Sequence, residues 1–437
     1  LPATRARADG YPNAVLRRQE NLSAPRQGLN GPWGHKDPHP GRPGPAIGIR
    51  QEAVRWRDRW LKGIDNGVDR DTMLRVWMQG SIPPSTHHAE RPGRWIAEAS
   101  WPSGNIEQHE FILAPAGQML PTEKATGNET RNLQSPLGLG LFAGTWCSYA
   151  AAPDLPHDQR QEDGGALVFD SAPLENPIEI LGSPCLELSI IADKPAAMLA
   201  VRLSDVAPDN KATRVTYGLL NLTHRDSSGH PQPLQPGEQY QVRIQLNHIA
   251  QHFPAGYHLR IAPSTSYWPL AWPAPDSAQV KIIAGISSLS LAVLAPRESD
   301  DQLRPFDEPE SAPPLETSMI EPPHHNWRVI RDLDTDTSTL EVINDAGVVQ
   351  IKVIDLELGR KAQEWYTYQG DDFNSVRGEI LWERSFKRGD WQVRTITRTV
   401  LTSTATDFYL RAELDAYEGD KRVYSQNWDI MIPRDYV

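Results

Sequence analysis

The sequence predicts a mainly β protein whose helices are confined to its beginning. After residue 73, apolar and polar residues alternate with a period of two in many short runs, which is typical of half-buried strands. Clusters of turn-forming residues separate these runs, and no helical period lies between them. These observations predict a short helix-containing segment, then an all-β sandwich of jelly-roll type, then an antiparallel β-domain.

The composition limits the classes of function. A chain of 437 residues is long enough for two to four domains, and 39% hydrophobic with 23% charged residues is typical of a globular protein. The net charge of −12 argues against nucleic acid as a partner. No apolar run reaches the ~18 residues that a membrane-spanning helix needs. We therefore expect neither a nucleic-acid nor a membrane partner.

The cysteines and the first residues bear on compartment and completeness. Two cysteines, Cys147 and Cys185, cannot form a disulfide framework, so we expect a reducing, cytoplasmic compartment and interpret both as small core side chains. The chain begins Leu1-Pro2, with neither a methionine nor a secretory apolar segment. We interpret it as a piece of a longer chain.

No cofactor and no metal site are expected. Two histidine pairs lie on proline-rich stretches without further ligands at a useful spacing, and an alternating run of aspartates lacks the glycine and distal glutamate of a calcium loop. We interpret them as surface loops and a turn: His87-His88, His324-His325, and Asp332, Asp334 and Asp336.

Residues 1–69 form the first predicted part. Residues 1–8 show no strand pattern, the run from Tyr11 to Leu22 suits a short helix, and 27–30 suits a short strand. Prolines and glycines make 38–45 an irregular loop.

A second helix is predicted over residues 49–62. Its apolar residues recur at helical spacing and end near basic residues, and Gly63 is suited to close the last turn. The apolar face comprises Ile49, Ala53, Trp56 and Trp60.

Residues 70–295 are predicted to form the sandwich and 327–437 the C-terminal antiparallel β-domain, joined by a proline-rich linker at 296–326. The clearest alternating runs are 74–78, 186–190, 199–203 and 240–246 in the sandwich, and 340–342, 349–353, 391–393 and 410–414 in the C-terminal domain. Turns are expected at Gly389-Asp390 and Glu418–Asp420. Trp268 and Trp272 are interpreted as sandwich packing, with the border of an acyl-binding pocket as the alternative.

Asp9 and His35 are the candidate catalytic residues. An imidazole exchanges protons near neutral pH, and a carboxylate can orient it. In α/β-hydrolases the triad follows the order Ser, Asp or Glu, His, and these two residues have that order. No G-x-S-x-G motif, which would supply the serine, occurs in the sequence. Taken alone, His35 could be an ordinary loop histidine and Asp9 a turn aspartate.

The sequence resembles the CocE/NonD hydrolases, which include cocaine esterase, X-Pro dipeptidyl-peptidases, α-amino-acid ester hydrolases and glutaryl-cephalosporin acylases. The resemblance covers about residues 8–295. The motifs that carry it are Ala8-Asp-Gly-Tyr11, Gly31-Pro-Trp-Gly-His35, Trp56–Gly63, Asp158-Gln-Arg160, Ser171–Leu174, Arg202–Val206, Gly218–Leu222, Tyr257–Arg260, Tyr267-Trp-Pro269 and Trp272-Pro273.

This resemblance implies a fold and a set of roles. Residues 1–69 would be the remnant of the C-terminal end of an α/β-hydrolase domain, with Asp9 as triad acid and His35 as base. Residues 70–295 would be the jelly roll typical of the C-terminal part of X-Pro dipeptidyl-peptidases. The serine would lie in an upstream hydrolase region, and the substrate would be a small ester or peptide.

Two functions therefore stand at this point. The first is a serine hydrolase present as a fragment without its nucleophile, inactive alone. The second is a non-catalytic β-sandwich protein for binding or oligomerisation, in which Asp9 and His35 are relics. A homo-oligomer is compatible with both.

Overall fold

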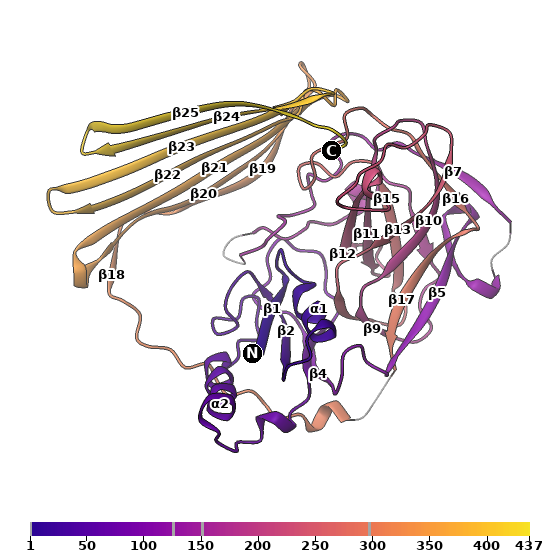
Figure 1. Ribbon diagram of the computed structural model, residues 1–437, viewed down its shortest axis with the longest axis horizontal. Helices are drawn as coiled ribbons and strands as arrows, with labels where there is room; N and C mark the ends of the chain where they lie inside the picture. Colours follow the sequence, from indigo (N-terminus) through magenta and orange to yellow (C-terminus); the bar gives the residue numbers. More distant parts are fainter. Residues whose placement is uncertain (1, 125–126, 150–152, 296–298) are drawn as a thin grey trace.

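Two β-sheets dominate the chain, as the computed structural model in Figure 1 shows for residues 2–124, 127–149, 153–295 and 299–437. Hydrogen bonds connect strands β1 to β17 into one 17-stranded sheet system, and the C-terminal strands form a separate 8-stranded sheet. The prediction of a mainly β protein is confirmed.

The N-terminal part alternates strands and helices: β1 (Pro2–Ala8), α1 (Ala14–Asn21), β2 (Gln27–Gly34), α2 (Ile49–Lys62) and β3 (Leu74–Gln79). β1 pairs with β2, and β2 with β3, both in parallel. A helix follows each of the first two strands, as parallel connections require. This arrangement brings the carboxyl ends of β1 and β2 to the same edge.

Two boundaries in this part differ from expectation. The prediction that residues 1–8 hold no strand is wrong for residues 2–8, whose backbone pairs with β2 from Pro2 opposite Gln27 to Ala8 opposite Gly34. β2 also continues to Gly34, four residues beyond the predicted end at Asn30. Backbone pairing to a neighbouring strand leaves no pattern in short segments such as 2–8, rich in Ala and Arg, and 31–34, rich in Gly.

The helices follow their predicted patterns. α2 spans the predicted residues and ends at Gly63, whose φ of 73° lies in the left-handed region that a side chain would disfavour. Trp56 on its apolar face is buried, whereas Trp60 is 43% exposed. α1 is shorter than predicted. Among the described residues, no helix is long and apolar enough to cross a membrane.

Most strands of the first sheet system surround one apolar core, to which β10, β11, β13, β15, β16 and β17 contribute. β10 pairs antiparallel with β13 and β17, and β11 with β12 and β15. The alternating runs predicted for the sandwich lie in β3, β10, β11 and β13. The bounds of the remaining strands are β4 (Gly93–Glu98), β5 (Ile106–Ala114), β6 (Gln118–Pro121), β7 (Glu129–Leu133), β8 (Phe169–Ser171), β9 (Ile178–Gly182), β10 (Cys185–Ala192), β11 (Met198–Val206), β12 (Ala212–Asn221), β13 (Gln239–Gln245), β14 (Ile249–Phe253), β15 (His258–Ser264), β16 (Val280–Ala284) and β17 (Ser287–Leu294). A one-turn helix, α3 (Arg160–Asp163), precedes β8.

The C-terminal sheet projects from the sandwich as a broad layer of long strands, coloured orange to yellow in Figure 1. From β19 to β25 each strand pairs antiparallel with the next. The predicted turns at 389–390 and 418–420 connect neighbouring strands here. The strands are β18 (Thr317–Glu321), β19 (His324–Asp332), β20 (Thr337–Ile351), β21 (Leu356–Gln369), β22 (Arg377–Arg388), β23 (Trp391–Ser403), β24 (Asp407–Glu418) and β25 (Lys421–Pro433). The alternation predicted through Val353 stops with β20 at Ile351.

The segment predicted as a linker is more structured than its composition suggests. Residues 296–298 lie outside the described residues. Further along, Arg304 forms an ion pair with Glu52 of α2, and the Phe306 ring lies 4.9 Å from that of Trp95. β18 lies inside the predicted linker and pairs with β20. A proline-rich segment has few apolar residues to bury, and its prolines lack a backbone N–H. The backbone groups of its other residues can still form hydrogen bonds with a neighbouring strand, as β18 does with β20.

Trp268 and Trp272 lie at the junction between the sandwich and the C-terminal sheet. Their rings are 5.1 Å apart, and the Trp272 ring lies 5.8 Å from Phe408 of β24. Trp272 Nε1 also donates a hydrogen bond to Ser403 Oγ at 2.9 Å. The two tryptophans share one apolar cluster with sandwich residues such as Leu137 and with Tyr368 of the C-terminal sheet. They are therefore packing residues, as predicted, but they pack against both β-domains and not against the sandwich alone.

Candidate active site

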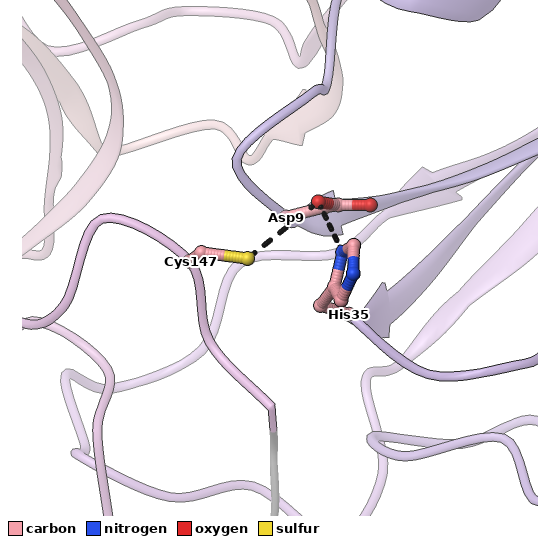
Figure 2. Close-up of side chains that lie close together, drawn as sticks. All are labelled: Asp9, His35 and Cys147. Atoms are coloured by element: carbon pink, nitrogen blue, oxygen red, sulfur yellow. Dashed lines mark hydrogen bonds and ion pairs between the residues drawn. The ribbon is translucent and has the colours of Figure 1, made fainter.

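Asp9 and His35 meet where two parallel strands end. Asp9 directly follows β1 and His35 directly follows β2, and Ala8 is opposite Gly34 in the pairing. Asp9 Oδ1 lies 2.9 Å from His35 Nδ1, as Figure 2 shows. The contact expected between these two side chains is therefore present, across 26 positions of sequence.

The two side chains differ in their exposure to solvent. Asp9 is buried, and its Oδ1 also accepts a hydrogen bond from the backbone N–H of Tyr11 at 3.2 Å. The His35 side chain keeps 35% of its surface exposed. The carboxylate is thus held in place, while the imidazole is presented to solvent.

A loop from a distant part of the chain packs against one side of the imidazole. The His35 backbone N–H donates to the carbonyl of Ser148 at 2.5 Å, and the Tyr149 ring stands edge-on to the imidazole at 5.1 Å. Trp146 lies 5.8 Å from Tyr11. The rings of Tyr149 and of Tyr11, the latter 6.3 Å from the imidazole, therefore flank the candidate base. No residue pattern in the sequence predicts that this loop lies there.

Cys147 on the same loop points at Asp9. Its Sγ lies 3.8 Å from Asp9 Oδ1, although 138 positions separate the two residues. Burial raises the pKa of the thiol, the Asp9 carboxylate adds to that effect, and the Gly10 backbone N–H opposes it. The interpretation of Cys147 as a core side chain is wrong.

Cys185 is not a core side chain either. It is only partly buried, and its Sγ accepts a hydrogen bond from Arg243 Nε at 3.1 Å. Both cysteines are free thiols. Their burial could not be inferred from residue type, because Cys147 lies in a loop and Cys185 is the first residue of β10.

A cavity of about 190 Å³ lies beside Asp9, between the N-terminal part and the sandwich. Burial raises the pKa of the Asp205 carboxyl to about 6, against a hydrogen bond from Ser81 and the charge of Arg91. Burial lowers the pKa of His88 to about 4, and Arg91 adds to that effect. The side chains that line this cavity include Asp9, His88, Arg91, Asp205, Arg214 and Gln251.

The other residues weighed as metal ligands form no group with metal-ligand spacing among the described residues. His88 was predicted on a surface loop but lines the cavity, while its neighbour His87 is exposed. His324 and His325 are exposed at the start of β19, a strand rather than a loop. The predicted turn after Asp332 is confirmed, since its carboxylate accepts the backbone N–H of residue 334 at 2.9 Å.

Within the described ranges, one group of side chains has the composition and spacing of a metal site. It consists of Asp9, His35 and Cys147, whose potential ligand atoms all lie within 4.8 Å of one another. The sequence patterns predict no metal site, and with the family resemblance they indicate Asp9 and His35 only as a catalytic pair.

The geometry of Asp9 and His35 suits proton transfer. A carboxylate on Nδ1 holds the imidazole tautomer that leaves Nε2 free to accept a proton, and it stabilises the imidazolium that then forms. The chemistry available here is therefore general acid–base catalysis.

Comparison with known proteins places this arrangement in context. Residues 66–285 match the family described as the X-Pro dipeptidyl-peptidase C-terminal non-catalytic domain. A putative serine esterase from Mycobacterium bovis is 26% identical over an alignment of 289 residues, which covers 58% of this chain and 42% of that protein. The cocaine esterase of a Rhodococcus species is 22% identical over an alignment of 264 residues, which covers 55% of this chain and 43% of that protein.

A solved structure, the CocE/NonD family hydrolase from Staphylococcus aureus, is 13% identical with a TM-score of 0.46 and covers 62% of this chain and 49% of that one. The chain spans less than half the length of the curated relatives that it matches.

Proposed function

Because the chain belongs to the family of the X-Pro dipeptidyl-peptidase C-terminal non-catalytic domain, among the CocE/NonD-type hydrolases, we propose that it is part of a serine hydrolase. In this proposal Asp9 is the triad acid, His35 is the general base, and an upstream hydrolase region carries the serine. The substrate is a small ester or peptide. The observation that carries the proposal is the 2.9 Å contact between Asp9 Oδ1 and His35 Nδ1.

The surrounding fold supports these roles. The parallel pairing of β1 with β2, with α1 between them and α2 after them, suits the C-terminal end of an α/β-hydrolase sheet over residues 1–69. Catalytic residues of such sheets gather outside the carboxyl ends of the strands, where Asp9 and His35 lie. The antiparallel strands that follow, over 70–295, suit the jelly roll of the family.

The proposed reaction follows from the orientation of the imidazole. The serine oxygen bonds to the acyl carbon while His35 Nε2 takes the hydroxyl proton. The bond to the leaving alcohol or amine then breaks, and Nε2 returns that proton to the leaving group. Water attacks the acyl-serine in the same way, giving its proton to Nε2, and the free acid departs as the serine oxygen regains a proton. Asp9 stays ionised throughout and stabilises the imidazolium.

The test uses a polypeptide extended upstream to include the hydrolase region. His35→Ala should reduce kcat by about three to six orders of magnitude, and Asp9→Asn by about four, because each breaks the proton transfer. His109→Ala, on an exposed position of β5, is the control and should keep full activity. A loss of less than tenfold on His35→Ala would remove His35 from the mechanism.

A second measurement uses the 437-residue chain alone. Without a serine at the triad, it should not be labelled by a fluorophosphonate probe, because an acid–base pair lacks the covalent step. Stable labelling above a heat-denatured control would show a nucleophile within this chain and overturn the assignment of the serine to an upstream region.

A second proposed function is self-association through β25, which would make the protein a homo-oligomer. All thirteen residues of β25 are exposed, and in the described chain β25 pairs only with β24. A free edge of this length is a template for another strand. Antiparallel pairing with a second copy, centred on Asn427, would place Tyr424 opposite Ile430 in both copies and no like charges opposite each other.

Sedimentation analysis of the chain tests this function. We expect a dimer that Ile430→Lys dissociates, because a lysine opposite Tyr424 removes an apolar pair and adds charge to the edge. Ile354→Lys is the matched control, since Ile354 has similar exposure outside the sheet edge. A monomer for the unaltered chain would exclude this second function.

A further inference from the structure

The cluster of Asp9, His35 and Cys147 has the ligand set of a zinc site. We infer that these three side chains bind one zinc ion, with a water molecule as the fourth ligand. The inference rests on the geometry of the cluster, and its inhibitory consequence, given below, rests on the proposed function.

The distances between the potential ligand atoms are close to those of a coordinated cluster. Bonds of about 2.0–2.3 Å to a tetrahedral zinc place ligand atoms roughly 3.3–3.7 Å apart. Here Asp9 Oδ1 is 2.9 Å from His35 Nδ1 and 3.8 Å from Cys147 Sγ, and all three ligand atoms lie within 4.8 Å of one another. Shifts of the ligand atoms by about 1 Å would bring all three to the separations of a tetrahedral zinc site.

The chemistry of the donors selects the metal. A thiolate with an imidazole suits zinc, whereas magnesium and calcium prefer oxygen ligands alone. The thiolate and the carboxylate together balance the two charges of the ion. On binding, the Cys147 thiol releases its proton to solvent, and the proton shared between Asp9 and His35 must also leave any nitrogen that takes the metal.

The elements around the cluster hold the three side chains in place. Asp9 is fixed by the backbone N–H of Tyr11 and His35 by its position after β2. The Cys147 loop is held by Asp154, whose carboxylate accepts from Ser148 Oγ at 2.6 Å and from the Tyr149 N–H at 3.0 Å. Three ligands from three separate segments are therefore preorganised before a metal arrives.

Zinc in this position would regulate the proposed hydrolase. Asp9 and His35 cannot both ligate zinc and pass a proton between a serine and a leaving group. Bound zinc and the proton transfer are thus mutually exclusive, and zinc acts as a reversible inhibitor.

The binding test uses the full 437-residue chain, stripped of metal, in a zinc titration against a chromophoric chelator. We expect one zinc per chain, with the affinity reduced at least about tenfold by Cys147→Ser, Asp9→Asn or His35→Ala. Cys185→Ser is the matched control, because Cys185 is the only other cysteine. Circular dichroism of each variant separates loss of a ligand from loss of fold.

Cobalt supplies a readout that a purely structural role of Cys147 would not give. Cobalt in the site should show a thiolate-to-metal charge-transfer absorption in the unaltered chain and in Cys185→Ser, and none in folded Cys147→Ser. Absence of zinc binding, or binding that folded Cys147→Ser retains in full, would overturn the inference.

The inhibition test uses the extended polypeptide. Hydrolysis should fall as zinc is added and recover with a chelator. If the extended polypeptide has no activity but the 437-residue chain binds zinc through Cys147, the proposed function fails and the zinc site stands. If the polypeptide is active and His35-dependent but the chain binds no zinc, the reverse holds.

Discussion

Strand β11 of the first sheet system is buried along its whole length, whereas strand β25 of the C-terminal sheet is exposed along its whole length. The first system encloses its own apolar core, with residues such as Leu188 and Leu203 completely buried. The C-terminal sheet buries apolar side chains mainly where it meets the sandwich, around Trp268 and Tyr368. The two sheets therefore depend on different sources of stability.

A long antiparallel sheet can thus be stable without enclosing an apolar core of its own. Its strands are joined by local pairings, and its ends are tied to the sandwich. Arg434, directly after β25, is buried and donates to the Pro273 carbonyl at 2.6 Å. Asn221 Nδ2 donates to the Tyr436 carbonyl at 2.7 Å. The sandwich thus acts as the support on which the second sheet is built.

The largest expected difference between the sheets concerns apolar truncation. Phe253→Ala should lower the free energy of unfolding by about 3–5 kcal/mol, because it leaves a cavity in a fully buried core. Phe386→Ala, at a position 41% exposed on β22, should cost less than about 1 kcal/mol. Urea unfolding measures both. Equal losses would mean that the C-terminal sheet also encloses a core.

The second prediction concerns pH and Asp205 of β11. Its carboxyl pKa is raised from 3.8 to about 6, chiefly by burial, so the folded state binds a proton more tightly than the unfolded state. The free energy of unfolding should therefore decrease as pH rises from about 4 to about 6, by about 3 kcal/mol in total. Asp205→Asn should flatten this dependence. An unchanged profile would contradict the raised pKa, and exposed Asp226→Asn is the control.

The third prediction concerns the contacts of Arg434, which connect the C-terminal sheet to the sandwich. Arg434→Met should cost about 1–3 kcal/mol, because it removes several hydrogen bonds to buried acceptors. Calorimetry should then resolve an earlier transition for the C-terminal sheet, with the sandwich transition unchanged. Exposed Arg388→Met should leave the profile as it was. A uniform shift of one transition would show that the two regions unfold as a unit.

The smallest expected effect is at Glu379 of β22, where the sign of the pH dependence reverses. Burial opposes the shift, but hydrogen bonds from Arg398 and Arg377 outweigh it and lower the pKa of this carboxyl. Its stabilising contribution is present above the ordinary pKa and is lost as pH falls through the lowered one. Glu379→Gln should remove less than about 1 kcal/mol at neutral pH, because both arginines are partly exposed. A double-mutant cycle with Arg398→Met measures it.

The sequence by itself determined the features that depend on local periodicity. The 3.6-residue period and Gly63 located α2 to the residue, and the two-residue alternation located β10, β11 and β13. The order of Asp9 and His35, read with the resemblance to a known family, identified the pair that the fold joins. These predictions succeeded because each rests on spacing within one element or on a motif.

Only the tertiary structure decided which distant segments meet. β1 is a strand because β2 pairs with it, and the proline-rich segment before β19 supplies β18 because β20 offers a free partner. Cys147 reaches Asp9, and Trp272 reaches Ser403, across more than a hundred positions in each case. Such contacts depend on the packing of whole elements against one another, so no local pattern of residue types encodes them.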